Sequence, residues 1–103
     1  MTEISELQSR LREFAEARNW GQFHIPKNLA MAIAGEAGEL VAEFQWLTPN
    51  ESSNLDNIDK EKVAMEMADV AIYLLRLSDV LSIDLLHAIR EKIDINESRF
   101  PIS

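Results

Sequence analysis

The sequence predicts an all-α fold, a four-helix bundle-like domain over residues 1–103 that oligomerises through its helices. Apolar residues recur at intervals of three and four, which is the spacing of one helix face. No alternating strand pattern of useful length is present, and only three glycines and three prolines interrupt the 103 residues. A chain of this length forms one domain with a thin core, which self-association often supplements.

The first helix is expected over residues 3–18. Its apolar positions recur at intervals of three, four and three, at Ile4, Leu7, Leu11 and Phe14. This rhythm breaks over residues 18–24, which we expect to form a loop. Pro26 suits a first helical turn, so a second helix is expected over residues 26–47, ending before Pro49.

The polar segment 50–57 predicts a linker to the second half of the chain. Asp59 is a suitable N-cap for a third helix, which is expected to continue to about Leu81. Short connections between four helices imply either a bundle or a pair of helical hairpins.

The fourth helix has two candidate N-caps, Ser82 and Asp84. It is expected to continue to about Ser98, and Pro101 is expected to end the ordered part of the chain.

The composition restricts the partners and the metals that the chain can bind. A net charge of −8 argues against a nucleic-acid polymer, whose phosphates need a basic surface. A small phosphorylated ligand remains compatible if divalent cations lie between it and the acidic groups. The sequence has no cysteine, so a metal site must use mainly oxygen ligands, which favour Mg²⁺, Mn²⁺ or Ca²⁺.

The N-terminal segment 1–6 contains neither a basic stretch nor an apolar segment typical of a signal peptide. The apolar runs are too short to cross a bilayer. We therefore expect a cytoplasmic protein with no membrane partner.

Two acid pairs with the same spacing lie on the second and third predicted helices. Glu36 and Glu39 form the first pair, and Glu66 and Asp69 form the second. At about 100° per residue, both pairs border the apolar stripe of their helix. If the two helices pack antiparallel, four carboxylates converge at the edge of the core. Glu43 extends the first stripe, either as a further ligand or as an exposed acid.

Such a convergence is unfavourable unless something neutralises it, because neighbouring carboxylates repel one another. Residues three apart share a helix face, so each pair can hold a divalent cation from two sides. The alternative interpretation is an acidic helix face exposed to solvent.

The sequence resembles the MazG-like all-α nucleotide pyrophosphohydrolase superfamily, and within it the dCTP pyrophosphatase branch. The resemblance extends from about Leu11 to Pro101, and the two acid pairs stand 26 residues apart. The matching segments are Asn19-Trp20-Gly21-Gln22-Phe23-His24, Pro26-x-Asn28-Leu29, Gly35-Glu36-x-Gly38-Glu39-Leu40, Phe44-Gln45-Trp46, Glu66-x-x-Asp69-Val70-x-Ile72-Tyr73-Leu74 and Lys92-x-Asp94-x-Asn96-x-x-Arg99-Phe100-Pro101.

This resemblance implies a Mg²⁺-dependent hydrolase, with Mn²⁺ as a possible substitute, that forms a homodimer or a homotetramer built as a dimer of dimers. Glu36, Glu39, Glu66 and Asp69 would hold the metal. Water would attack the α-phosphorus of a deoxynucleoside triphosphate, giving the monophosphate and pyrophosphate. Glu39 is our candidate for accepting the proton of that water. The expected substrates are dCTP-like or modified nucleotides, which such an enzyme removes from the nucleotide pool.

The resemblance also implies that Trp20 and Trp46 bracket the base of the nucleotide. Stacking on a base contributes about 1–3 kcal/mol in single-stranded nucleic-acid complexes. His24 is a candidate for lining the same pocket, with a structural role as the alternative.

Three further residues are candidates for contacts with the sugar and the phosphates. Tyr73 lies on the acid side of the third helix rather than on its apolar side, which favours a contact with the sugar. Lys92 and Asn96 are four residues apart near the end of the fourth helix, so both can point at a triphosphate.

Two alternative functions remain compatible with the sequence. The first is the same reaction on another base, as in dUTP or dATP. The second is a non-catalytic helical dimerisation module, because the third helix has a second apolar side. That side is made by Ala64, Ala71, Ile72 and Leu75.

Overall fold

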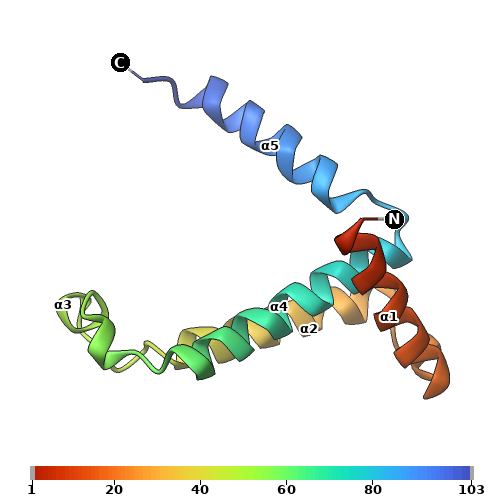
Figure 1. Cartoon of the computed structure of the whole chain (residues 1–103), viewed down its shortest axis with the longest axis horizontal. Coiled ribbons are helices and arrows are strands. Elements are labelled where there is room, and N and C mark those ends of the chain that lie inside the picture. The colour runs from red at the N-terminus through yellow and green to blue at the C-terminus, as the bar shows by residue number, and fades with distance from the viewer. Residues whose placement is uncertain (1, 103) are drawn as a thin grey trace.

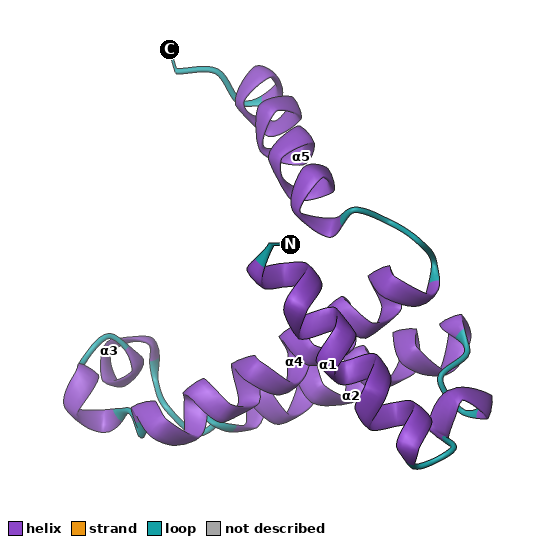
Figure 2. Ribbon diagram, turned by 45° about the vertical axis from the view of Figure 1, so that its right-hand side comes forward, coloured by secondary structure: helices purple, strands orange, loops and turns teal. Residues whose placement is uncertain are grey.

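The computed structural model describes residues 2–102, and this part of the chain is helical without any strand. The all-α prediction is therefore confirmed. The four long helices are α1 (Glu3–Ala17), α2 (Pro26–Ala42), α4 (Lys60–Val80) and α5 (Leu85–Arg99) (Figure 1, Figure 2). The short elements are η1 (Trp20–Gln22), α3 (Pro49–Ser52) and η2 (Leu55–Asn57).

The helix starts follow the local signals in the sequence. Pro26 is the first residue of α2. Asp59 caps α4, where its Oδ1 accepts a hydrogen bond from the Lys62 N–H at 3.2 Å. Of the two candidate caps for α5, Asp84 is the one used, since its Oδ1 accepts from the His87 N–H at 3.0 Å. Ser82 instead takes a left-handed conformation, with φ 56°, in the turn between α4 and α5.

The predicted end of the second helix is wrong by five residues, because α2 ends at Ala42 rather than at 47. Beyond it the backbone tightens, as shown by the Glu43 N–H bonding to the Leu40 carbonyl at 3.2 Å. The predicted 50–57 linker also contains helical turns. Thr48 and Glu51 form a capping box that starts α3. The prediction of an irregular linker over residues 50–57 did not take this capping signal into account.

The centre of the molecule is the pair of α2 and α4, which lie side by side and run antiparallel (Figure 1). Leu29 of α2 and Leu75 of α4 are buried. The next most extensive contact is that of α1 with α4, which is secured by a salt bridge between Arg12 and Asp79 at 2.6 Å. Gln8 Nε2 of α1 also donates to Ser78 Oγ at 3.0 Å.

The fourth long helix, α5, extends away from the other three (Figure 1, Figure 2). The expected bundle is therefore not closed by one chain, because α5 has no extensive partner among the described residues. The radius of gyration is 16.7 Å, against about 13 Å for a compact domain of this length. The accessible surface is 8098 Å², against about 5,900 Å² for a compact monomer of this mass.

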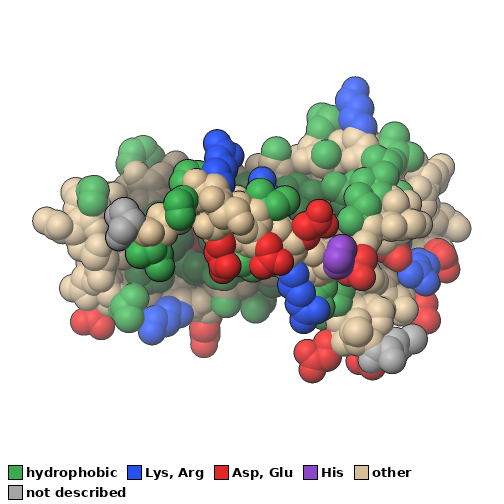
Figure 3. Space-filling model, turned by 90° about the horizontal axis from the view of Figure 1, so that it is seen from above, with side chains coloured by type: hydrophobic (Ala, Val, Ile, Leu, Met, Phe, Trp, Pro, Cys, Tyr) green, Lys and Arg blue, Asp and Glu red, His purple; other side chains and the backbone are tan. Residues whose placement is uncertain are grey.

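Much of this excess surface is apolar. Ile89 and Ile93 of α5 are 46% and 49% exposed. In the view from above, uncovered hydrophobic side chains are spread over the face of the molecule (Figure 3). Between residues 2 and 102, no helix is both long enough and apolar enough to cross a membrane.

Candidate active site

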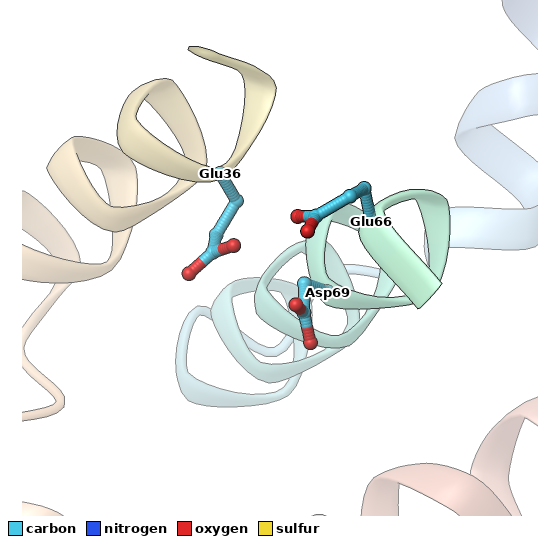
Figure 4. A group of neighbouring side chains, drawn as sticks. All are labelled: Glu36, Glu66 and Asp69. Carbon is cyan, nitrogen blue, oxygen red and sulfur yellow. The ribbon is translucent and has the colours of Figure 1, made fainter. Parts of the chain in front are cut away.

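Three of the four predicted acids meet between α2 and α4. Glu36 of α2 faces Glu66 and Asp69 of α4, and one carboxylate oxygen from each lies within 4.8 Å of the others (Figure 4). The antiparallel pairing of the two helices produces this meeting, since it brings the middle of α2 against the middle of α4. Glu36 and Glu66 are half-buried and Asp69 is exposed. We refer to these three residues as the acid cluster.

The fourth predicted acid, Glu39, is exposed and lies outside the group that meets within 4.8 Å. Glu43 is half-buried, and its carboxylate lies 3.6 Å from Lys62 Nζ. Glu43 therefore acts as a partner of a lysine at the edge of the site.

The pKa of Glu66 is raised above the ordinary value for a glutamate. Desolvation is the largest cause, and repulsion by the neighbouring acids adds to it. Those acids, in decreasing order of effect, are Glu39, Asp69, Glu36 and Glu43. The site thus concentrates negative charge around Glu66.

The acid cluster fits a hard divalent cation such as Mg²⁺ or Mn²⁺. All three donors are carboxylate oxygens, which are the ligands these ions prefer. A bound cation would remove the repulsion that raises the pKa of Glu66.

A cleft of roughly 610 Å³ lies beside α4. Its wall is mostly apolar and comes from α1, η1 and α4, with His24 added from the loop before α2. Phe14 and Trp20 pack edge to face in this wall, with their ring centroids 5.4 Å apart. The lining residues are Leu7, Arg10, Leu11, Phe14, Trp20, His24, Ala68, Ala71, Ile72, Tyr73, Leu75 and Arg76.

Tyr73 connects the cleft to the acid cluster. It lines the cleft and follows Asp69 by four residues on α4, a spacing that places two side chains next to each other on one helix face. An apolar, aromatic cleft therefore adjoins a group of carboxylates.

The structure brings together Trp20, His24 and Tyr73, because all three line this cleft. Trp46 does not line it. It lies beyond the end of α2 and is 87% exposed.

Lys92 and Asn96 are exposed on α5, the helix that extends away from the rest of the chain. Neither residue lines the cleft. One chain alone therefore leaves these two candidates, like Trp46, outside the cleft.

Sequence reasoning missed Arg10 and Arg76 of the cleft wall. Arg76 is only 7% exposed, and its position within Leu74-Leu75-Arg76-Leu77 was a usable signal. An arginine surrounded by leucines on a helix indicates a buried guanidinium that needs polar partners.

The partners of Arg76 are His24 and Asp79. Its Nε donates to His24 Nδ1 at 3.0 Å, and its Nη1 donates to Asp79 Oδ2 at 3.3 Å. The pKa of Asp79 is lowered, chiefly because Arg12 donates hydrogen bonds to its carboxylate. The pKa of His24 is lowered as well, by desolvation first and by the charge of Arg76 second.

Comparison with known proteins identifies close relatives over nearly the whole chain. The sequence is 44% identical over 100 residues to dCTP pyrophosphatase 1 of Homo sapiens, a match that covers 95% of this chain and 59% of the human protein. It is 42% identical over 101 residues to dCTP pyrophosphatase 1 of Mus musculus, covering 96% and 59%. The chain thus spans about three fifths of the length of these relatives.

A solved structure extends the comparison to the fold. The crystal structure of a pyrophosphatase from Archaeoglobus fulgidus superposes with a TM-score of 0.90 at 40% identity, covering 99% of this chain and 95% of that one. No family model matches the sequence. Because the identity, the coverage and the fold agree for this pyrophosphatase, the chain belongs to the MazG-like all-α nucleotide pyrophosphohydrolase superfamily.

Proposed function

We propose that the chain is a Mg²⁺-dependent nucleoside triphosphate pyrophosphohydrolase that converts dCTP-like or modified deoxynucleotides to monophosphates and pyrophosphate. One observation carries this proposal. Three carboxylate oxygens lie within 4.8 Å of one another, beside an aromatic cleft large enough for a nucleoside. The relatives named above support the reaction type and the choice of base.

The acid cluster would hold the metal, and Glu39 would join it or assist from the side. When bound, the cation supplies neutralisation of the phosphate oxygens and lowers the pKa of water. Glu39 is exposed and lies outside the group that meets within 4.8 Å, so its carboxylate is available to accept the proton of the attacking water.

The cleft would hold the nucleoside. Trp20 offers a ring for stacking on the base, and its ring lies 5.9 Å from that of His24. Tyr73 stands between the cleft and Asp69, in the place where a sugar would connect a base in the cleft to phosphates at the acid cluster.

A second copy of the chain would complete the site in a homodimer or a dimer of dimers. On a helical projection, Lys92 and Asn96 border the same side of α5 as Ile89 and Ile93. When that apolar side packs on another chain, the lysine and the asparagine reach toward the phosphates held there. The exposed Trp46 would in the same way reach a base bound in the cleft of another chain.

A screen of nucleoside triphosphates with detection of pyrophosphate tests the proposal. Pyrophosphate should appear in a single step with Mg²⁺ and dCTP, without orthophosphate or a nucleoside diphosphate. An oxygen-18 label from water should end on the monophosphate, because the α-phosphorus is the point of attack. Release of orthophosphate, or a label in pyrophosphate, would place the attack elsewhere.

Trp46→Ala should raise KM for dCTP about tenfold, equivalent to ~1.4 kcal/mol, and reduce the preference among bases. The melting temperature should change little, because the side chain is 87% exposed in one chain. Steady-state kinetics with dCTP, dUTP and dATP checks this expectation. A loss of kcat with unchanged KM and unchanged base preference would assign Trp46 to the scaffold.

A further inference from the structure

One wall of the cleft contains a buried guanidinium in a chain of polar contacts. Arg12 donates to both Asp79 oxygens at 2.6 and 2.9 Å. Asp79 also accepts from Arg76, and Arg76 Nε donates to His24 Nδ1 at 3.0 Å. The contacts join α1, α4 and the loop before α2. Since a buried arginine is unfavourable without a counter-ion, Asp79 explains how Arg76 can remain charged in this wall.

This arrangement fixes the tautomer of His24. A guanidinium has only N–H donors, so the Nδ1 atom that faces Arg76 must be an acceptor without a proton. In the neutral ring the proton is then on Nε2. No group among residues 2–102 accepts a hydrogen bond from this Nε2, and His24 lines the cleft. The second nitrogen is therefore available to a ligand.

The surroundings also oppose a charged imidazolium. A proton on Nδ1 would face the Arg76 N–H and remove the hydrogen bond. Arg10 lines the same cleft and adds a second positive charge, while Asp79 lies behind Arg76 and is already shared with Arg12. Burial acts in the same direction, and the pKa of His24 is accordingly lowered. His24 is thus a neutral donor at neutral pH.

We propose that Arg76 is a positioning residue that holds His24 as a neutral Nε2–H donor, and that this donor selects a base with a hydrogen-bond acceptor at the contacted ring position. The identity of the ligand as a nucleotide rests on the proposed function, whereas the tautomer of His24 is independent of that function. A pyrimidine with an unprotonated N3, such as cytosine, accepts a hydrogen bond from Nε2–H. Uracil carries a hydrogen on N3, which would place two donors against each other. The pair of Arg76 and His24 therefore favours cytosine over uracil.

Two substitutions of matched length separate the hydrogen bond from the bulk of Arg76. In Arg76→Gln, the side-chain amide nitrogen takes the position of the arginine Nε and still donates to Nδ1. In Arg76→Met, a methyl group takes that position and no donor remains. Circular dichroism and thermal melting establish that both variants fold before either is compared. Both variants lose the contact with Asp79, so any loss of stability from that contact is common to the two.

The first measurement uses nitrogen-15 NMR of the imidazole rings in the nucleotide-free protein. The chain has two histidines, so His87→Gln assigns the spectrum. In the wild type and in Arg76→Gln, Nδ1 of His24 should be unprotonated and Nε2 protonated. In Arg76→Met the two tautomers should mix, and the titration midpoint of His24 should rise. A protonated Nδ1 in the wild type overturns the proposal, whatever the enzyme does with nucleotides.

The second measurement compares the binding of dCMP and dUMP in the presence of Mg²⁺. The wild type should prefer dCMP, and dCMP should shift the Nε2 signal of His24. The preference should fall about fivefold in Arg76→Met, the scale of one neutral hydrogen bond, and persist in Arg76→Gln. An unchanged preference in Arg76→Met overturns the proposal. Absence of pyrophosphate release by the wild type would overturn the proposed reaction alone, because neither measurement here requires turnover.

Discussion

Glu66→Gln should lower Mg²⁺-dependent release of pyrophosphate by about 10³-fold, the scale expected when one preorganised stabilising group is lost from an active site. Glu66 contributes a carboxylate oxygen to the group that lies within 4.8 Å, and Glu36→Gln and Asp69→Asn neutralise the other two carboxylates. All three variants should behave alike, because a cation held by three carboxylates loses a charged ligand in each. Turnover at saturating dCTP, measured over a range of Mg²⁺ concentrations, checks the expectation.

The same variant should raise the melting temperature of the metal-free protein at neutral pH. The pKa of Glu66 is raised in the folded state, so its ionised form opposes folding, and this penalty is present above the folded-state pKa and disappears below the unfolded one. The gain in Glu66→Gln should therefore vanish as pH falls below the ordinary range of a glutamate. Added Mg²⁺ should stabilise the wild type and leave the variant unaffected.

Glu61→Gln is the matched control, since Glu61 is exposed in the first turn of the same helix. Loss of this charge should lower the free energy of unfolding by at most about 1 kcal/mol, through the helix dipole. It should leave turnover at the wild-type level. Near-wild-type activity in Glu66→Gln, with the fold intact, would show that the acid cluster takes no part in the reaction.

Ile89→Glu combined with Ile93→Glu should dissociate the enzyme into 11.7 kDa chains and abolish turnover at micromolar concentration. Full burial of one such side chain contributes about 1.5–3 kcal/mol, and about half of each is still exposed in one chain. The loss of two therefore weakens association at least about tenfold, and burying two glutamates opposes it further. Both residues are nearly half exposed in one chain, so the helix itself should still form. Under the proposed assembly, activity should fall because Lys92 and Asn96 would no longer reach the phosphates in another chain.

Light scattering and kinetics on the same samples test this expectation. Glu91→Gln is the control, because it removes an exposed charge on the side of α5 opposite Ile89 and Ile93 and should leave both mass and activity unchanged. A wild-type protein that scatters only as an 11.7 kDa particle at micromolar concentration would contradict the proposed assembly. So would a monomeric double variant that retains full turnover.

The helices could be predicted from the sequence because their signals are local. The interval of three and four residues marks each long helix, and Asp59 caps α4 as predicted. The end of α2 could not be predicted, since apolar residues keep a helical interval through the turns that follow Ala42. The direction of α5 could not be predicted either, because an amphipathic helix shows the same pattern whether its partner lies in the same chain or in another.

The site shows the same division between local and distant signals. Glu36, Glu66 and Asp69 were predictable because their intervals fix their helix faces and antiparallel packing then brings the faces together. The hydrogen bond between His24 and Arg76 joins residues 52 positions apart. No interval in the sequence encodes such a pair, so it became visible only in the folded chain.

The thin interior has a consequence for calorimetry and denaturant unfolding. Among residues 2–102, the apolar side chains that are buried are Ala15, Leu29 and Leu75. The heat capacity change of unfolding grows with the apolar surface exposed, and about 1.2–1.5 kcal/mol/K is usual for 100 residues. A single chain should therefore unfold with a smaller heat capacity change and a shallower urea dependence than its length suggests. A heat capacity change near the usual value would indicate that other copies of the chain cover apolar surface in the assembled protein.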